Sequence, residues 1–227
     1  HSSEALRIAA VVALRRQGAF EELTAFLDDA SPQVMSDAMR AIYDEASPQT
    51  FNDHPNVLTA LATSLDPSRP APVNVRAIAA NRRLGTIEAA RRVAAFLTTP
   101  KLDPALRVEA LYSLESWPDA STLDPMDGRH FPVPQGDPEV LGEVVGPEIW
   151  SLAHDSHDKV SRRVIALLRK IEPSPAQLDR VAGFVLDEKQ RSSIRIEWLR
   201  WLRKQKIDLF SSAGGQALAS KAVELRV

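Results

Sequence analysis

One apolar pattern recurs along most of the chain and constrains the fold more than any other feature. In each copy, apolar residues stand at positions 1, 5, 8, 9 and 12, which is the spacing of one buried face on an α-helix. The copies begin at Leu6, Val34, Val73, Leu106, Val160 and Ile194. Positions 5 and 8 are often alanine, which lets two helices approach closely. The pattern predicts an all-α fold built from similar helices.

A shorter apolar helix is expected before most copies, ending in a turn at an Asp or Pro. Leu23, Phe26 and Leu27, for example, stand directly before Asp28. The unit is therefore a pair of helices joined by a turn. A single pair cannot cover its own apolar face, so neighbouring pairs must stack into a solenoid.

The second helix of several pairs begins with an apolar residue followed by arginine, runs through small residues and ends near glycine. Arg7 and Gly18 follow this pattern, whereas Met35, Asn74 and Ser161 stand where arginine is expected. The pattern resembles the HEAT repeat. The resemblance implies an α-α superhelix, a HEAT/armadillo-like solenoid.

We expect one solenoid domain over residues 4–227. Its predicted parts are a lone helix of the second type at 4–17, helix pairs at about 20–46, 56–85, 88–117, 138–172 and 176–206, and a last helix at 215–226. Because both ends are half-repeats without a full capping pair, we expect the chain to be a fragment of a longer protein.

Residues 117–137 interrupt the helical pattern with several prolines and glycines. Proline removes a backbone donor and fixes φ, so this segment is predicted to be an insertion loop. Its apolar residues, among them Phe131 and Val133, favour a loop packed onto the solenoid. A functional lid over a small-ligand site is the alternative, because long loops in compact domains are often functional.

Composition excludes several classes of function. The chain of 227 residues is 44% hydrophobic, and its 28 basic and 30 acidic side chains lack the basic excess typical of nucleic-acid-binding proteins. The absence of cysteine excludes a disulfide, a thiolate metal site and covalent c-type haem within these residues. No apolar run reaches the ~18 residues that a membrane-spanning helix needs. We expect no cofactor, no nucleic-acid partner and no direct membrane insertion.

A longer stretch is similar to a more specific family. It comprises Arg107 to Leu111, Leu114 to Pro118, Leu123-Asp124-Pro125 and Gly128-Arg129. These residues look like the HEAT-repeat portion of the large planctomycete-type membrane-bound dehydrogenases, which join a sorbosone-dehydrogenase-like β-propeller, helical repeats and a c-type haem domain. The resemblance implies a spacer or docking role in the periplasm or cell envelope, and it transfers no catalytic residue.

Two clusters of polar residues could bind a metal or act in catalysis, but we favour a structural role for both. His154 to Asp158 holds two imidazoles and two carboxylates, but it falls in a predicted turn and is interpreted as a helix cap rather than a metal site. The carboxylate pair Asp28 and Asp29 occupies a similar turn. No nucleophile elbow or phosphate-binding glycine loop is present. No catalytic residue and no metal ligand is predicted.

Trp198 and Trp201 lie among basic residues and suggest an alternative function, a HEAT-like DNA-modifying enzyme of the DNA glycosylase type. Both tryptophans, however, occupy template positions 5 and 8, which face the core. We therefore predict that they are buried.

The predicted function is a non-enzymatic scaffold for protein interaction or domain spacing. The concave face of the solenoid is the predicted binding surface. Polar residues beside the apolar stripe are the candidate binding residues on that face: Asp37, Arg40, Glu109, Tyr112 and Arg163. The expected partner is another protein, or neighbouring domains of the same chain.

Overall fold

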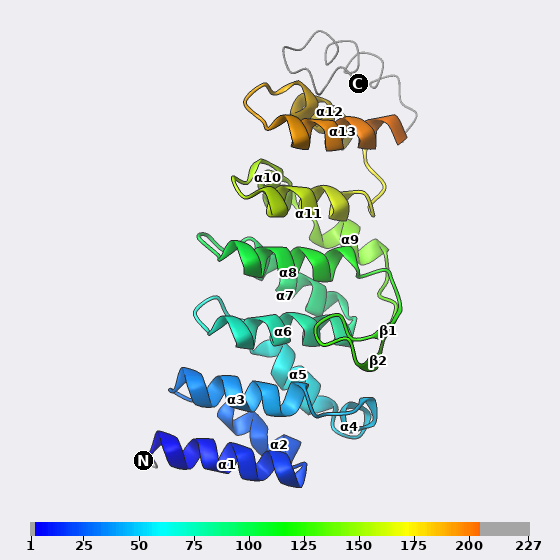
Figure 1. Ribbon diagram of the computed structural model, residues 1–227. Coiled ribbons are helices and arrows are strands. Elements are labelled where there is room, and N and C mark those ends of the chain that lie inside the picture. The colour runs from blue at the N-terminus through cyan, green and yellow to red at the C-terminus, as the bar shows by residue number, and fades with distance from the viewer. Residues whose placement is uncertain (1–2, 205–227) are drawn as a thin grey trace. The chain divides into compact units, whose positions relative to one another are not determined.

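The computed structural model describes residues 3–204, and the predicted last helix at 215–226 lies outside them. The chain divides into two units, one ending at Val144 and the other beginning at Val145 (Figure 1). This division falls inside the range predicted as one helix pair, 138–172. Helices dominate both units, and the α-α solenoid class predicted from the repeated pattern is confirmed.

The first unit is built from α-helices, one 3-10 turn and one small hairpin. Its elements are α1 (Glu4–Gln17), α2 (Phe20–Leu23), η1 (Thr24–Phe26), α3 (Pro32–Tyr43), α4 (Pro48–Asp53), α5 (Pro55–Thr63), α6 (Ala71–Leu84), α7 (Ile87–Leu97), α8 (Pro104–Glu115), β1 (Ser121–Leu123), β2 (His130–Val133) and α9 (Glu139–Val144).

Local sequence signals begin and end these helices. Ser31 and Asp103 are N-caps whose side chains accept a backbone N–H of the first turn, and a proline follows each at the first helical position. Gly18 and Gly85 end α1 and α6 with φ of 67° and 65°, a left-handed conformation that favours glycine. The chain therefore turns sharply after each of these long helices.

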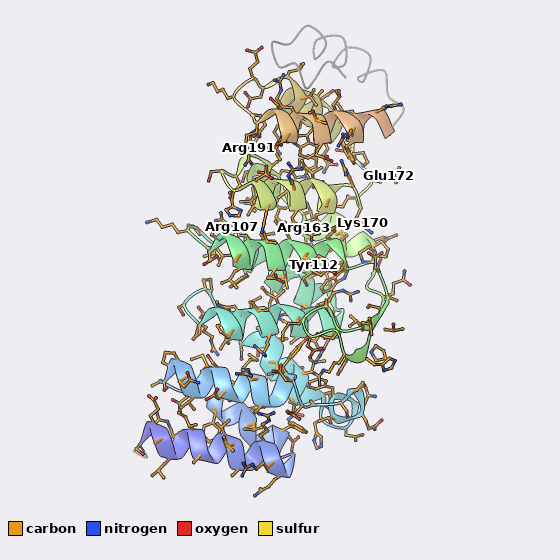
Figure 2. The ribbon with its side chains drawn as sticks, viewed as in Figure 1. Arg107, Tyr112, Arg163, Lys170, Glu172 and Arg191 are labelled. Atoms are coloured by element: carbon orange, nitrogen blue, oxygen red, sulfur yellow. The ribbon has the colours of Figure 1, made fainter. Side chains whose placement is uncertain are left out.

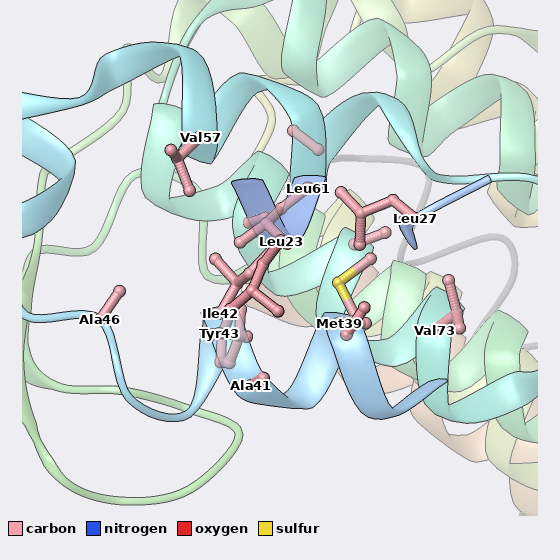
Figure 3. Close-up of a cluster of buried hydrophobic side chains, with 14 of the residues drawn as sticks. Leu23, Leu27, Met39, Ala41, Ile42, Tyr43, Ala46, Val57, Leu61 and Val73 are labelled. Carbon is pink, nitrogen blue, oxygen red and sulfur yellow. The ribbon is translucent and has the colours of Figure 1, made fainter. Parts of the chain in front are cut away.

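The helices of the first unit form two layers. α1, α3, α6 and α8 contact one another in succession, and α2, α5 and α7 lie behind them (Figure 1). In α3 the repeated apolar stripe faces the interior of the unit. Val34, Ala38 and Ile42 of α3 are fully buried there, within the cluster shown in Figure 3. The burial that the periodicity predicts is therefore confirmed for α3.

The first copy of the pattern differs, because the predicted burial of Leu6 was wrong. Leu6 is 63% exposed, and the buried residue of α1 is Val11. The main contacts of α1 are with α3 and α2, and Val11, Ile8 and Leu14, rather than Leu6, pack in the core cluster. Periodicity identifies an apolar face, but burial also depends on what lies beside it.

Asn81 interrupts the apolar stripe of α6 and is nevertheless fully buried. Its amide nitrogen donates to the carbonyl of Ala62 in α5 at 2.8 Å and to that of Ala77 in α6 at 2.9 Å. Its oxygen accepts a hydrogen bond from Arg92 Nε of α7 at 2.9 Å. Asn81 thus joins three consecutive helices. Its hydrogen bonds replace those that the amide group would make to water if it were exposed.

Residues 117–137, here called the hairpin loop, contain β1 and β2. The strands pair antiparallel, with Ser121 opposite Val133 and Leu123 opposite His130, and the ladder is irregular between Ser121 and Leu123. Phe131 and Val133 of β2 are buried. Phe131 belongs to the core cluster of the first unit, so the loop is packed against the helices.

The second unit comprises α10 (Pro147–Ser151), η2 (Leu152–His154), α11 (Asp158–Leu168), α12 (Pro175–Leu186) and α13 (Ser192–Lys204). Its core is aromatic: the rings of Trp150 and Trp198 stack with centroids 6.2 Å apart, and Trp201 meets Trp198 edge-on. Within residues 3–204, no helix is both long and apolar enough to cross a membrane.

Gly136, where the hairpin loop returns to the helices, is expected not to tolerate a side chain. A Cβ there would lie 2.4 Å from the ring of Trp117 and 2.7 Å from the Trp117 carbonyl oxygen. We expect Gly136→Ala to lower the free energy of unfolding by about 2 kcal/mol, because overpacking forces neighbours to move. Chemical denaturation measures the change.

Gly142→Ala in α9 is the matched control. A Cβ at position 142 meets no atom within 4 Å. Alanine there is expected to stabilise the helix by about 0.5–1 kcal/mol, because it restricts the unfolded chain. Equal effects of the two substitutions would contradict the proposed close approach at Gly136.

Candidate functional site: the hairpin loop and the pocket beside it

A buried ion pair fixes the hairpin loop to the helices. Arg83 of α6 donates through Nη2 and Nε to Asp124 Oδ2, at 2.7 and 3.0 Å, and the side chains are 1% and 0% exposed. The guanidinium lies between the rings of Tyr43 and Phe131, 3.7 Å from each centroid. A guanidinium stacks well on aromatic rings because it is planar and weakly hydrated. The attraction between the cation and the rings is stronger where water is excluded.

Asp124 also organises the turn between the strands. Its Oδ1 accepts the backbone N–H groups of Met126 at 2.9 Å and Asp127 at 3.2 Å, and its Oδ2 accepts the Tyr43 hydroxyl at 2.7 Å. A buried carboxylate is stable only when such donors replace its water. One side chain therefore shapes the turn and attaches it to α3 and α6.

These contacts shift two pKa values. Burial would raise the pKa of Asp124, but Arg83, the Tyr43 hydroxyl and the Met126 N–H together hold it below its usual range. Burial raises the pKa of Tyr43 well above its usual value, and the neighbouring Asp124 adds to this effect. At neutral pH, Asp124 is a carboxylate and Tyr43 a neutral donor.

Arg82, the residue before Arg83, holds both ends of the hairpin loop. Its guanidinium donates to the carbonyls of Pro134 at 2.8 Å and Ser116 at 3.0 Å, and also to that of Asp119. Burial lowers the pKa of Arg82, and the nearby Asp119 opposes that effect. Arginine suits this position because its fork of donors reaches several carbonyls at once.

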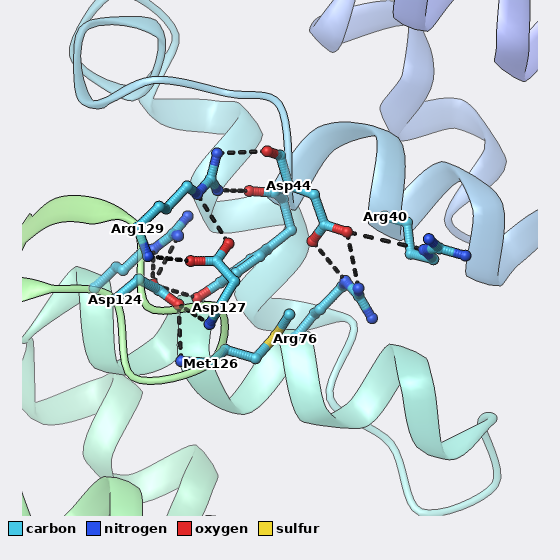
Figure 4. A network of polar contacts seen from close by, with 9 residues as sticks. Arg40, Asp44, Arg76, Asp124, Met126, Asp127 and Arg129 are labelled. Carbon is cyan, nitrogen blue, oxygen red and sulfur yellow. Dashed lines mark hydrogen bonds and ion pairs between the residues drawn. The ribbon is translucent and has the colours of Figure 1, made fainter.

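A second polar network joins the tip of the hairpin loop to the end of α3 (Figure 4). Arg129 donates to the backbone carbonyls of Tyr43 and Asp44. Asp44 in turn accepts two hydrogen bonds from Arg76 at 2.9 Å and pairs with Arg40 at 3.8 Å. The hairpin loop is therefore held at its ends, its turn and its tip.

Two adjoining recesses lie where the hairpin loop meets α6 and α8. The larger has a volume of about 380 Å³ and the smaller about 30 Å³. Both are bordered by Arg82, Tyr112 and Pro125, so Tyr112 stands at their junction. We call the two together the Tyr112 pocket. The contacts of the hairpin loop described above fix one wall of this pocket.

Two of the predicted binding residues border this pocket. Glu109 and Tyr112 stand three residues apart on α8, and so share one face of the helix. Tyr112 is 38% exposed and is labelled in Figure 2. Their position makes them available to a ligand, and their role in binding stays a prediction.

The other predicted residues lie elsewhere. Asp37 of α3 is half-buried and accepts a hydrogen bond from Gln33 at 2.9 Å. Arg40 belongs to the network of Asp44, and Arg163 lies on α11 of the second unit. The structure therefore brings together Glu109 and Tyr112 and leaves the remaining three outside the pocket.

The acidic and histidine turns are occupied by structural contacts. Asp155 accepts the N–H of His157 at 2.7 Å, and Asp158 pairs with Arg162. His154 Nδ1 contacts the Gln190 amide at 2.9 Å. Within residues 3–204 no group of three or more His, Asp or Glu side chains is placed to hold a metal ion.

The earlier carboxylate pair is also divided between two separate ion pairs. Asp29 accepts from Arg7 Nε at 2.7 Å, whereas Asp28 pairs with Arg69 at 2.5 Å. Arg7 holds the pKa of Asp29 below its usual range, and the Ser31 N–H adds to this effect. Asp28 and Asp29 therefore link helices to turns.

The predicted burial of the tryptophans in α13 is confirmed. Trp198 is 0% and Trp201 2% exposed. Arg195, a basic residue of the same helix, is buried too and donates to the carbonyl of Val185 at 2.7 Å. Arg200 and Arg203 are exposed.

Sequence reasoning did not assign roles to the residues that hold the hairpin loop. Arg82 and Arg83 stand at the end of an apolar helix where solvated basic residues are common, and Asp124 lies 41 positions away from Arg83. The available signal is two adjacent arginines just before the Gly85 cap, together with Asp124-Pro125 in a proline-rich loop. That signal does not specify the pairing.

Comparison with known proteins shows the fold alone. No protein-family model matches the sequence, and no curated protein is significantly similar to it. A crystal structure of an engineered protein is similar with 16% identity and a TM-score of 0.53, over 92% of each chain. A designed armadillo repeat protein in complex with the peptide (KR)4 shows 16% identity and a TM-score of 0.48, over 95% of this chain and 81% of that one.

Loss of the Asp124 charge is expected to release the hairpin loop. Asp124→Asn leaves the Arg83 cation buried without a counter-charge, which costs about 3–5 kcal/mol when a buried pair is broken. Asp127→Asn is the control, because the Asp127–Arg129 pair is partly exposed and such pairs contribute only about 0–1 kcal/mol. Denaturant titration of both variants at neutral pH measures the difference.

The same interaction predicts a loss of stability in acid. The pKa of Asp124 is lower in the folded chain than the ~3.9 of an unfolded aspartate, so its contribution is full above about pH 4 and disappears as pH falls through the folded pKa. Asp124→Asn should remove this part of the pH dependence. An unchanged acid profile in the variant would contradict the role assigned to the Asp124 carboxylate.

Proposed function

We propose that this chain is a non-enzymatic helical-repeat scaffold that binds a protein partner through the Tyr112 pocket and the surrounding surface of α3, α6 and α8. The observation that carries the proposal is the rigid attachment of the hairpin loop beside an exposed tyrosine. A recess of about 380 Å³ accommodates one or two side chains of a partner. Because its walls are already fixed, little ordering is needed on binding.

The chemistry of the buried polar groups supports a binding role over catalysis. Tyr43 and Asp124 have shifted pKa values, and perturbed groups often mark active sites. Here, however, the Asp124 carboxylate is surrounded by donors that fix the hairpin loop. Its oxygens are used in structure, and its environment favours the charged form rather than proton transfer.

A nucleic-acid-modifying enzyme is the less favoured function. That hypothesis rested on Trp198 and Trp201 as exposed stacking groups between basic residues. Both rings are packed inside the second unit, and Trp198 contacts the rings of Trp150 and Phe184. Base stacking requires an accessible aromatic face, so these two residues do not support nucleic-acid binding.

We further propose that the scaffold is the spacer of a larger envelope oxidoreductase, in which the enzymatic parts lie on other domains. This proposal rests on the resemblance to the membrane-bound dehydrogenases. The residues that carry the resemblance include Trp117, Asp124 and Arg129, which hold the hairpin loop or pack beneath it. Their roles concern architecture, which is compatible with a spacer.

Tyr112→Ala is expected to weaken partner binding. Peptides selected from a random library on the purified chain would be measured by calorimetry against the wild type and variants. Tyrosine is frequent among residues that dominate binding energy, so we expect the Kd to rise about tenfold or more. Glu22→Ala, at an exposed position on α2, is the control and should leave the Kd unchanged. Equal affinity for Tyr112→Ala and wild type would refute the proposed surface.

The spacer proposal is tested on the native protein. An antibody against this segment would capture the intact protein from its source, for measurement of its size and visible absorption spectrum. A much larger chain with a haem band is expected. A colourless protein of about the size of this chain would overturn the oxidoreductase assignment and leave the binding proposal standing.

A further inference from the structure

The smaller recess of the Tyr112 pocket has an unusual combination of walls. Val75, Ile78 and Ala79 of α6 form an apolar side, and Ser113 of α8 and Met126 of the hairpin loop also border the space. Its volume of about 30 Å³ compares with the ~10–15 Å³ that one water molecule requires. A compact group fits there, whereas a broad planar one does not.

Ser113 supplies an unsatisfied polar group to this recess. The residue is 5% exposed, and its Oγ has no hydrogen-bond partner within residues 3–204. A hydroxyl buried without a partner costs about 1–3 kcal/mol, so it is rarely left in that state without reason. The Ser116 hydroxyl one turn later is different, because it donates to the Ser113 carbonyl at 3.1 Å.

The charges around the pocket favour a cation. Glu109 is exposed at the rim of the smaller recess, and no ion pair of Glu109 is found within the described part of the chain. Asp119 borders the larger recess, and Arg82 directs its donors to backbone carbonyls. Asp124 is neutralised by Arg83. Arg82 and Asp119 lie close enough to interact and offset each other, so the charge of Glu109 leaves the pocket net negative, and the Ser113 hydroxyl and the Glu109 carboxylate can both accept hydrogen bonds.

The larger recess continues this site towards the hairpin loop. Leu123, Pro125 and Val133 are part of its apolar lining, and Tyr112 borders both this recess and the smaller one. A chain of methylene groups can lie along these residues while its end reaches Ser113. The ring of Tyr112 would then lie beside a passing cation, an interaction that is attractive at partly exposed sites.

We propose that the Tyr112 pocket binds the side chain of a lysine from the protein partner. The ammonium group enters the smaller recess and donates to Ser113 Oγ and to the Glu109 carboxylate. The methylene stem packs against the apolar lining of the larger recess. Lysine is preferred to arginine because an ammonium is compact and a guanidinium is a wide plane. The proposal rests on the proposed function and names the partner group that the site recognises.

The test uses the complete 227-residue chain, isotope-labelled for NMR. It is titrated with Nα-acetyl-lysine methylamide, with the norleucine analogue, which has the same stem without a charge, and with the arginine analogue. We expect saturable shifts at Tyr112 and Ser113 with the lysine compound, weaker binding of the arginine compound and no saturable shift with norleucine. Single-residue ligands lack the rest of the interface, so a Kd in the millimolar range is expected.

Variants identify the groups responsible. Glu109→Gln and Ser113→Ala are each expected to raise the Kd of the lysine compound about two- to fivefold, as for a partly exposed ion pair or a single hydrogen bond. Glu88→Gln removes the same charge from an exposed position on α7 and should leave the Kd unchanged. Ser113→Ala should leave the thermal stability of the free chain unchanged or higher, because the hydroxyl has no partner to lose.

Several results would overturn the lysine assignment: equal shifts with norleucine, tighter binding of the arginine compound, no binding of the lysine compound, or an unchanged Kd in both Glu109→Gln and Ser113→Ala. If selected peptides still require Tyr112 in such a case, the protein-binding function stands and only the lysine assignment fails. If selected peptides are also indifferent to Tyr112, both proposals fail.

Discussion

The ion pair between Arg83 and Asp124 is the interaction on which the geometry of the first unit depends. It is costly to bury two charges, and the cost is offset only where hydrogen bonds and stacking are complete. Tyr43 contributes to both, because its ring stacks on the guanidinium and its hydroxyl donates to the carboxylate. A buried pair of this kind has one suitable geometry. It therefore specifies where the hairpin loop lies more sharply than apolar contact alone would.

The pocket follows from that attachment. α6 contributes Arg82 and Arg83 at its last turn to hold the hairpin loop, and the preceding turns of the same helix form the apolar wall of the smaller recess. α8 contributes one face that runs through Glu109, Tyr112 and Ser113. The residues that hold the hairpin loop and the residues that border the pocket therefore lie on successive turns of α6 and on the adjacent face of α8. Arg82 and Arg83, which hold the loop, are buried, and Glu109 and Tyr112, which are available to a partner, border the pocket beside them.

Sequence periodicity predicted most of the helices and much of their core, including Val34 in α3 and Trp198 in α13, because a buried helical face repeats every three to four residues. It did not predict α4, where Ser47 and Pro48 signal a helix start but only Phe51 is buried. Nor did it predict β1, whose three residues are all exposed and carry no alternation. Leu6 shows a further limit, since a periodic stripe does not say whether another element covers it.

The candidate site was predictable only in part. Glu109 and Tyr112 were found because they stand beside an apolar stripe on one helix. The pocket that they border joins α6, α8 and the hairpin loop, and the meeting of segments so far apart depends on tertiary structure. Ser113 was missed because a small polar residue inside a helix resembles ordinary helix packing. Its unpartnered hydroxyl is visible only when all of its neighbours are known.

The hairpin loop follows α8 in the chain but is bonded to α6 and to the end of α3. In a simple solenoid each repeat contacts only its neighbours, so repeats can fray or unfold one after another. Here a segment of one repeat also holds an earlier one, since Arg129 bonds to carbonyls 85 and 86 positions before it. This closes a long loop in the chain and should slow folding, because distant segments must meet first. In return, the repeats from α3 to α8 should open together as one cooperative body rather than singly.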